Sequence, residues 1–253
     1  MHFAVIADTD VGIVKKTNQD SLLVKHAESA QGEILLAAIC DGMGGLAKGE
    51  AASAAVIRTF SEWFDTELRY ELERPDMHVI GGKWALILKD LNIQLLEYGQ
   101  KHDLSLGTTF TGILFIKDEF VVVHVGDTRA YYLGKKLEQL TTDQTFVERE
   151  VRRGNMTLQQ AKTDKRRNML LQCVGASEKV EPEIIVGKTQ SGMYMLCSDG
   201  FRHEISEKEI YDYLNQTNFT SKESMRKNVR YLIDQGKKRQ EKDNISTILI
   251  NVE

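Results

Sequence analysis

Four aspartates in this sequence each stand at one end of a strand-like apolar run, beside a small or turn-forming residue. They are Asp41, Asp127, Asp199 and Asp243. A strand end holds a carboxylate rigidly, and a following glycine such as Gly42 lets the backbone turn so that its own carbonyl oxygen faces the same point. Hard divalent cations such as Mg²⁺ and Mn²⁺ prefer this kind of oxygen ligand. Each Asp–Gly pair alone is typical of an ordinary hairpin turn, so two interpretations stay open: separate turns, or one shared cation site.

A competing motif overlaps the first of these aspartates. The sequence Gly-Met-Gly-Gly-Leu-Ala at 42–47 matches G-x-G-x-x-A, the fingerprint of dinucleotide-binding folds. That fingerprint also needs a second strand that ends in an acidic residue about 20 positions later. Here the helical pattern continues through Glu62 and Asp65 instead. Nicotinamide binding is therefore a weak alternative, and the sequence contains neither a Walker A motif nor a Cys/His cluster with zinc spacing.

Composition narrows the class of protein. The 253 residues include 33 Lys and Arg against 37 Asp and Glu, so the net charge of −4 gives no basic footprint for nucleic acid. Three cysteines, Cys40, Cys173 and Cys197, are too few for a disulfide framework and indicate a reducing compartment. The longest apolar run, 34–40, is far too short to cross a membrane. We expect a cytoplasmic protein that binds neither nucleic acid nor membranes.

The elements that must position the aspartates follow from hydrophobic periodicity. Strand and helix patterns alternate in blocks, which predicts one α+β domain over 1–253 with antiparallel sheets covered by helices. The first strands, 3–7, 21–25 and 33–40, and the last are expected to share one sheet, and the four strands within 109–140 to form an antiparallel meander. The predicted strands are 3–7, 21–25, 33–40, 109–116, 120–125, 129–133, 136–140, 183–188, 193–197 and 245–252. One predicted helix of about five turns starts after Gly49. The other predicted helices cover 82–101, 143–174, 207–216 and 221–238, the last with Ser221 as N-cap.

A series of short motifs runs through the whole chain. They are Thr9-Asp10-Val11-Gly12, Asn18-Gln19-Asp20-Ser21, Cys40-Asp41-Gly42-Met43-Gly44-Gly45, Gly107-Thr108-Thr109, His124-Val125-Gly126-Asp127-Thr128-Arg129, Leu140-Thr141-Thr142-Asp143, Cys197-Ser198-Asp199-Gly200-Phe201 and Asp243-Asn244-Ile245-Ser246. In this order they resemble the metal-dependent PP2C-type (PPM family) protein serine/threonine phosphatases, in particular the short bacterial members. The resemblance implies an α-β-β-α sandwich of two antiparallel sheets flanked by helices.

The resemblance also implies a set of metal ligands. Asp41 would bridge two Mn²⁺ or Mg²⁺ ions, and the backbone carbonyl of Gly42 would join at one of them. Asp199 and Asp243 would complete the other. Asp127, together with Asp199, matches the residues that hold a third, weaker ion in similar bacterial enzymes. The implied reaction is hydrolysis of phosphoserine or phosphothreonine by a hydroxide that bridges the two ions, without a covalent enzyme intermediate.

Other residues are implied to support this centre. Asp20 would orient metal-bound waters, with Gln19 beside it in place of the Glu found in many relatives, and Asn244 would give local hydrogen-bonding support. Lys15 stands where many relatives carry a phosphate-binding Arg, and a lysine can neutralise a phosphate but cannot grip it in bidentate fashion. Met43 stands where some relatives carry His, so we expect a metal-bound water to act as the acid.

One segment and one histidine lie outside this core set. Residues 143–176 resemble the family's flap, but Asp143-Gln144-Thr145 replaces the common Asp-His-Ser, which bears on substrate selection. We call residues 143–176 the flap segment below. His203 follows the Asp199 motif and is interpreted as an exposed loop residue.

The expected partners are phosphoprotein substrates and, from the resemblance, a cognate Ser/Thr protein kinase, with the chain acting as a monomer. Two alternatives remain. The first is a weakly active or inactive PP2C-like module that binds phosphoproteins for regulation, which Lys15 and Gln19 leave open. The second is a narrower phosphatase that resets a sigma-factor switch by dephosphorylating one small protein.

Overall fold

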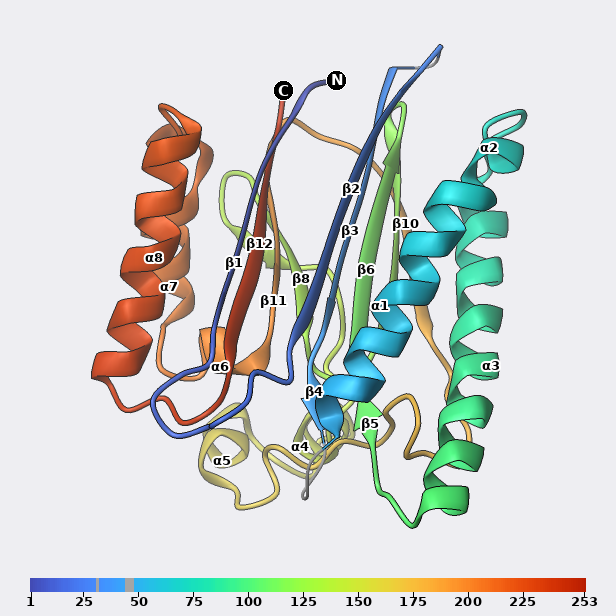
Figure 1. Cartoon of the computed structure of the whole chain (residues 1–253). Coiled ribbons are helices and arrows are strands. Elements are labelled where there is room, and N and C mark those ends of the chain that lie inside the picture. Colours follow the sequence, from blue (N-terminus) through green and yellow to red (C-terminus); the bar gives the residue numbers. More distant parts are fainter. Residues whose placement is uncertain (31, 44–47) are drawn as a thin grey trace.

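The computed structural model of the chain describes residues 1–30, 32–43 and 48–253. Two five-stranded antiparallel sheets pack face to face, and helices cover the outer face of each (Figure 1). The α-β-β-α sandwich expected from the resemblance is therefore confirmed. Residues 44–47, which complete the G-x-G-x-x-A motif, lie outside the described part of the chain.

The first sheet contains both ends of the chain, so the prediction that the first strands share a sheet with the last holds for β1 and is wrong for strands 21–29 and 32–40, which belong to the second sheet. Its strands, in spatial order, are β1 (Phe3–Asp10), β12 (Ile245–Val252), β11 (Gly192–Cys197), β8 (Arg129–Leu133) and β9 (Leu137–Gln139). The second sheet contains, in order, β10 (Glu183–Lys188), β7 (Glu119–Val125), β6 (Phe110–Ile116), β3 (Gly32–Cys40) and β2 (Ser21–Ser29). A short pair, β4 (Gly42–Met43) with β5 (Gly107–Thr108), extends from one end of the sandwich.

The helices divide between the two sheets and one end of the sandwich. The second sheet is covered by α1 (Gly49–Thr66) and α3 (Met77–His102), joined by the short α2 (Leu68–Glu71). The first sheet is covered by α7 (Glu207–Leu214) and α8 (Lys222–Lys238), with a 3₁₀ turn at Gln216–Asn218 between them. At the end of the sandwich that carries β4 lie α4 (Phe146–Arg152), α5 (Leu158–Thr163) and α6 (Asp199–Arg202) (Figure 1).

Three apolar layers hold this arrangement together. Between the sheets, Phe115 packs edge-on against Tyr194. Between the second sheet and its helices, Trp84 packs edge-on against Phe60 and Trp63. Burying a large apolar side chain contributes about 1.5–3 kcal/mol, so these layers supply the main driving force for assembly and make the strand ends a rigid support.

The predicted meander within 109–140 is wrong at its middle pairing. Strands β6 and β7 pair as a hairpin and β8 pairs with β9, but β8 leaves the second sheet and joins β11 in the first. The chain changes sheets at Gly126, whose φ of +109° is a conformation that residues with a side chain rarely adopt. A Cβ at this position would also lie 2.6 Å from the Thr109 side chain.

The predicted helical stretch over 143–174 is largely wrong as well. Only α4 and α5 are helical there, and each starts at a threonine N-cap, Thr145 and Thr157. Gly154 adopts a φ of +75° between them, which ends the helical run, and Asp164 after α5 is extended. The charge-rich pattern of this segment lacks a continuous apolar face, so tertiary contacts decide its path.

The antiparallel pairing brings the important strand ends to one edge. The end of β11 and the start of β12 lie together, because Cys197 pairs with Thr247. The end of β3 lies at the same end of the sandwich, because Cys40 pairs with Ser21 and the nearby Gln19 is hydrogen-bonded to Asn244, just before β12. In Figure 1 this end also carries α4, α5, α6 and β4, whereas both chain termini lie at the opposite end.

Candidate metal centre

Asp41 leaves the end of β3 in a backbone that is hydrogen-bonded on both sides. Its N–H donates to the Thr109 hydroxyl at 2.9 Å. Its carbonyl oxygen accepts the Thr109 N–H and the Thr108 hydroxyl, both at 2.9 Å. These contacts use the peptide groups and fix the backbone that carries the Asp41 carboxylate.

Gly42 follows Asp41 at a point where the chain passes very close to the start of α1. A Cβ on Gly42 would lie 2.3 Å from the carbonyl oxygen of Gly49, so no other residue fits here without a shift of the backbone. The N–H of Gly42 donates to the carbonyl oxygen of Gln19 at 3.2 Å. Glycine is therefore required at position 42, because only a residue without a side chain lets the backbone pass this close to Gly49.

Gln19 and Asn244 join three loops around the centre. The Oδ1 atom of Asn244 accepts the N–H of Gln19 at 2.9 Å, and its amide donates to the carbonyl oxygen of Val11 at 2.9 Å. The Gln19 side chain donates to Glu50 at 3.4 Å, and the Gln19 carbonyl accepts the Ser53 hydroxyl at 2.6 Å. Both side chains therefore support the loops that carry the aspartates, and their predicted relation to metal-bound waters stays a prediction.

The carboxylates gathered at this end repel one another. Burial raises the pKa of Asp41 well above its ordinary value, and the charges of Asp20, Asp199, Asp127 and Asp243 raise it further. Burial also raises the pKa of Asp20 to about 7, with Asp199 and Asp243 adding to the shift. Mutual effects of this kind require that these side chains face one space, so the structure brings together the aspartates that the sequence placed far apart.

Several carboxylate oxygens in this space have no hydrogen-bond partner within the described residues. Both side-chain oxygens of Asp20 and the Oδ1 atom of Asp199 are buried in this state. The side chains of Ser198 and Ser246 lie near enough to lower the pKa of Asp20, but without hydrogen bonds of good geometry. Buried polar groups in native proteins are almost always paired, and an unpaired buried charge is costly.

These donors fit a hard divalent cation, because they are all oxygens and because their uncompensated negative charge lies out of water. Among residues 1–30, 32–43 and 48–253, no group of three or more His, Cys, Asp or Glu side chains is arranged as a set that could hold an ion. The carboxylates are thus gathered around one space without forming a closed ligand shell.

Lys15 supplies one positive charge at the mouth of the centre. Its Nζ atom lies 2.9 Å from Oδ1 of Asp243, with 40% of the Lys15 side chain and 35% of the Asp243 side chain exposed. Burial lowers the pKa of Lys15, but the contact with Asp243 and the charges of Asp41 and Asp199 outweigh it and raise the pKa. Lys15 therefore lies where the sequence predicts, and its predicted contact with phosphate stays a prediction.

The interpretation of His203 as an exposed loop residue is wrong. Only 18% of its side chain is exposed, and its Nε2 atom lies 3.4 Å from Oδ2 of Asp199. Its Nδ1 atom lies 3.5 Å from Glu241, whose other carboxylate oxygen accepts the N–H of Asp243 at 2.9 Å. The four-residue spacing from Asp199 to His203 on a helical turn is the sequence signal that could have indicated this contact.

Asp127 lies at the edge of the centre and faces an arginine that sequence reasoning missed. Only 7% of Asp127 is exposed, and burial together with the charge of Asp199 raises its pKa to about 7. Arg202, at the end of α6, donates to the carbonyl oxygen of Asp127 at 2.9 Å. A charged residue after the apolar Phe201 gave no periodic signal in the sequence, so its burial could not be predicted.

Both ends of the flap segment are attached beside the aspartates. At its start, the N–H of Gln144 donates to the carbonyl oxygen of Gly126 at 2.7 Å, next to Asp127. At its end, Val174 and Thr108 exchange two backbone hydrogen bonds of 2.9 Å each. Thr108 is the residue whose hydroxyl supports Asp41, so a shift of the flap segment would reach the centre directly.

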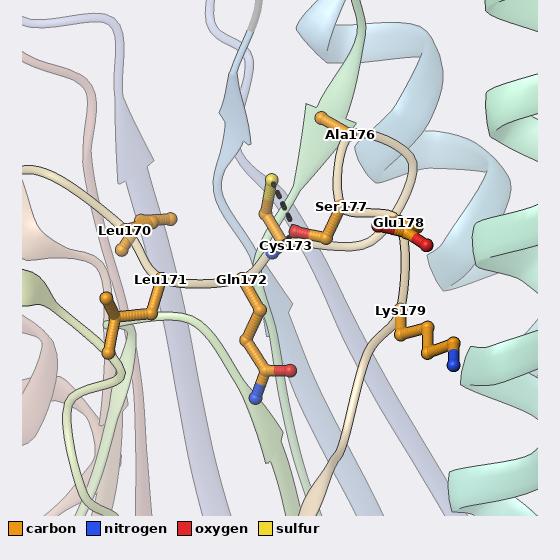
Figure 2. A pocket seen from close by; sticks show the side chains of 8 residues that line it. All are labelled: Leu170, Leu171, Gln172, Cys173, Ala176, Ser177, Glu178 and Lys179. Atoms are coloured by element: carbon orange, nitrogen blue, oxygen red, sulfur yellow. Dashed lines mark hydrogen bonds between the residues drawn. The ribbon is translucent and has the colours of Figure 1, made fainter.

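A cavity of about 590 Å³ lies along the last part of the flap segment (Figure 2). Cys173 and Ser177 lie in it side by side, with the Ser177 hydroxyl 4.0 Å from the Cys173 sulfur. The cavity is lined by Leu170, Leu171, Gln172, Cys173, Ala176, Ser177, Glu178 and Lys179. None of the aspartates of the centre lines it, so this cavity and the carboxylate centre have no lining residue in common.

The structure thus combines an α-β-β-α sandwich with carboxylates gathered at one of its ends. A family model for protein phosphatase 2C matches residues 13–249. The chain therefore belongs to the protein phosphatase 2C family, a family of protein serine/threonine phosphatases.

Relatives of known sequence agree with this family. The chain is 34% identical to the serine/threonine protein phosphatase PstP of Mycobacterium tuberculosis over 212 residues, which cover 82% of the chain but 38% of PstP. It is 30% identical to the serine/threonine phosphatase stp of Listeria welshimeri over 247 residues, covering 96% of the chain and 93% of that protein. The chain thus spans well under two thirds of PstP and nearly all of stp.

Solved structures agree as well. Serine/threonine phosphatase Stp1 of Staphylococcus aureus superimposes with a TM-score of 0.87 at 27% identity, covering 100% of this chain and 96% of that one. The catalytic domain of PstP in complex with two manganese ions superimposes with a TM-score of 0.76 at 28% identity, covering 98% of this chain and 97% of that one. Within the described residues, none of the helices combines the length and the apolar character needed to cross a bilayer.

Proposed function

We propose that this protein is a phosphoprotein phosphatase that hydrolyses phosphoserine and phosphothreonine and depends on two divalent cations, Mn²⁺ or Mg²⁺. The observation that carries the proposal is the set of buried, unpartnered carboxylate oxygens of Asp20 and Asp199 beside the strongly perturbed Asp41. Perturbed carboxylates of this kind cluster at functional sites. Membership of the protein phosphatase 2C family supports the same assignment.

Asp41, the carbonyl oxygen of Gly42, Asp199 and Asp243 would hold the two ions. When bound, the ions supply activated water and offset negative charge on the phosphoryl oxygens. Asp41 is suited to this role because the charges of Asp20, Asp199 and Asp243 all act on its carboxylate. Asp20 would accept hydrogen bonds from waters around the ions, because its two oxygens have no protein partner of good geometry among the described residues.

Lys15 would attract the phosphate group of the substrate. Its ammonium group is partly exposed at the mouth of the centre and carries a charge opposite to that of the phosphate. Asp243, which holds Lys15 at 2.9 Å, is also one of the residues that would hold the ions, and a carboxylate shared with cations would bind Lys15 less tightly. The Lys15 ammonium would then be available to the phosphate as a point charge.

The broader setting is part of the proposal. Phosphoproteins are the proposed substrates, with a Ser/Thr kinase as the partner enzyme, and residues 1–253 act as one phosphatase domain and as a monomer. All three cysteines are free thiols, which supports the proposed cytoplasmic location.

The test is hydrolysis of a phosphothreonine peptide by the purified chain with Mn²⁺, with Mg²⁺ and with a chelator. The proposal expects turnover with metal, loss of turnover with chelator, and loss in Asp41→Asn. Asp118→Asn is the matched control, because Asp118 is 68% exposed in the hairpin between β6 and β7. Folded protein without turnover under any condition would refute the proposal, and metal-independent phosphopeptide binding by that protein would favour the regulatory module instead.

A further inference from the structure

Arg202 occupies a position that has the ligands of a cation site. Only 13% of its side chain is exposed. Its Nη2 atom lies 2.9 Å from the carbonyl oxygen of Asp127, 3.6 Å from Oδ2 of Asp127 and 3.4 Å from Oδ2 of Asp143. Two carboxylates and one carbonyl around a single point are the donors that a hard cation prefers, and here a guanidinium nitrogen lies among them.

Asp143 already has a partner of its own. Arg129 binds it in bidentate fashion, with Nε 2.7 Å from Oδ1 and Nη2 2.7 Å from Oδ2. Burial raises the pKa of Asp143, but Arg202 and Arg129 outweigh it and hold the pKa below the ordinary value. Two carboxylates therefore face two guanidinium groups, and because Arg129 compensates Asp143, the charge of Arg202 is left for Asp127.

Arg202 is held in this place by its own short helix. The preceding Phe201 is 1% exposed and packs in the apolar layer between the first sheet and its helices. A Cβ on Gly200 would lie 2.2 Å from the carbonyl oxygen of Asn244, so α6 touches the chain beside Asp243 without room between them. The backbone of Arg202 is thus fixed, and the contacts with Asp127 and Asp143 hold its guanidinium at the site.

The two oxygens of Asp199 are used differently. Oδ2 lies 3.4 Å from Nε2 of His203, whereas Oδ1 is buried without a hydrogen-bond partner among the described residues. Oδ1 is therefore the oxygen left for an ion at Asp41. The imidazole of His203 lies beside Oδ2 of Asp199, just as the guanidinium of Arg202 lies beside Asp127.

We propose that the buried guanidinium of Arg202 takes the place of a third cation beside Asp127, so that this chain binds two divalent cations and not three. The proposal rests on the two-ion function proposed above. A divalent ion bound by the Asp127 carboxylate would lie beside a positive charge that already has three oxygen partners, and would have to displace it. Asp127 then serves to hold Arg202 and with it the start of the flap segment.

The test counts Mn²⁺ ions bound per chain by equilibrium dialysis of the full-length protein, with circular dichroism to show that each variant is folded. We expect two ions in the unchanged protein, two in Arg202→Lys, which keeps the charge, and three in Arg202→Gln, which removes it. Asp127→Asn should keep both ions. Arg69→Gln, an exposed change on α2, is the matched control and should keep two.

Any other number of bound ions would overturn the inference. Three ions in the unchanged protein, or two in a folded Arg202→Gln, would show that Arg202 does not exclude the third ion. If Arg202→Gln does not fold, Asp127→Asn decides, because loss of one ion would make Asp127 a ligand despite Arg202. Binding of no ions by the unchanged protein would instead refute the metal dependence on which both proposals rest, so the two failures give different results.

Discussion

Replacing Asp20 with asparagine should stabilise the metal-free protein while weakening its metal binding. Burial, with Asp199 and Asp243, raises the pKa of Asp20 from 3.8 to about 7. Each pKa unit corresponds to 1.36 kcal/mol, so at pH 8 the ionised carboxylate of Asp20 lowers the free energy of unfolding by ~4 kcal/mol. Asparagine removes that charge in a nearly equal volume.

The sign of the pH dependence follows from the raised pKa. The protonated carboxyl of Asp20 is present below pH 3.8 in both states, so no cost arises there. The cost grows as pH rises towards 7, where the folded state also loses its proton. The advantage of Asp20→Asn should therefore be ~4 kcal/mol at pH 8 and ~2 kcal/mol at pH 5.

Urea unfolding in the presence of chelator measures this difference. Trp63 and Trp84 are buried between the second sheet and its helices, so their fluorescence reports unfolding. The exposed control Asp118→Asn should change the free energy of unfolding by less than about 0.5 kcal/mol. Mn²⁺ should stabilise the unchanged protein more than Asp20→Asn. Equal stability of Asp20→Asn and the unchanged protein at pH 8, or a difference that does not fall at pH 5, would refute the reasoning.

Three further predictions concern the centre itself. Lys15→Met should raise KM for a phosphopeptide several-fold with little change in kcat, and steady-state kinetics showing an unchanged KM would remove Lys15 from phosphate binding. Gly42→Ala should destabilise the fold by about 1–3 kcal/mol, because its Cβ would lie 2.3 Å from the Gly49 carbonyl oxygen; urea unfolding with no change would contradict this contact. Asp199→Asn should lose most activity while keeping its circular dichroism spectrum, and full turnover would exclude Asp199 from the centre.

The sequence by itself determined the elements whose signals are local. Strand β12 begins and ends where its apolar run does, and α8 begins at the Ser221 N-cap with the expected side-chain hydrogen bond. The positions of Asp41 and Asp199 at strand ends could also be predicted, because each apolar run stops where the aspartate and a glycine follow. The gathering of these aspartates could be predicted only from the order of family motifs, since spacing along the chain does not encode distance in space.

Tertiary structure alone decided the features that depend on long-range contacts. β8 joined the first sheet because the turn at Gly126 redirected the chain and β11 offered a free edge, which no local period records. His203 became buried against Asp199, and Arg202 against Asp127, because α6 is fixed between the first sheet and the loop before β12. A charged side chain looks the same in sequence whether water or a buried carboxylate compensates it, and only the packed fold determines which partner it has.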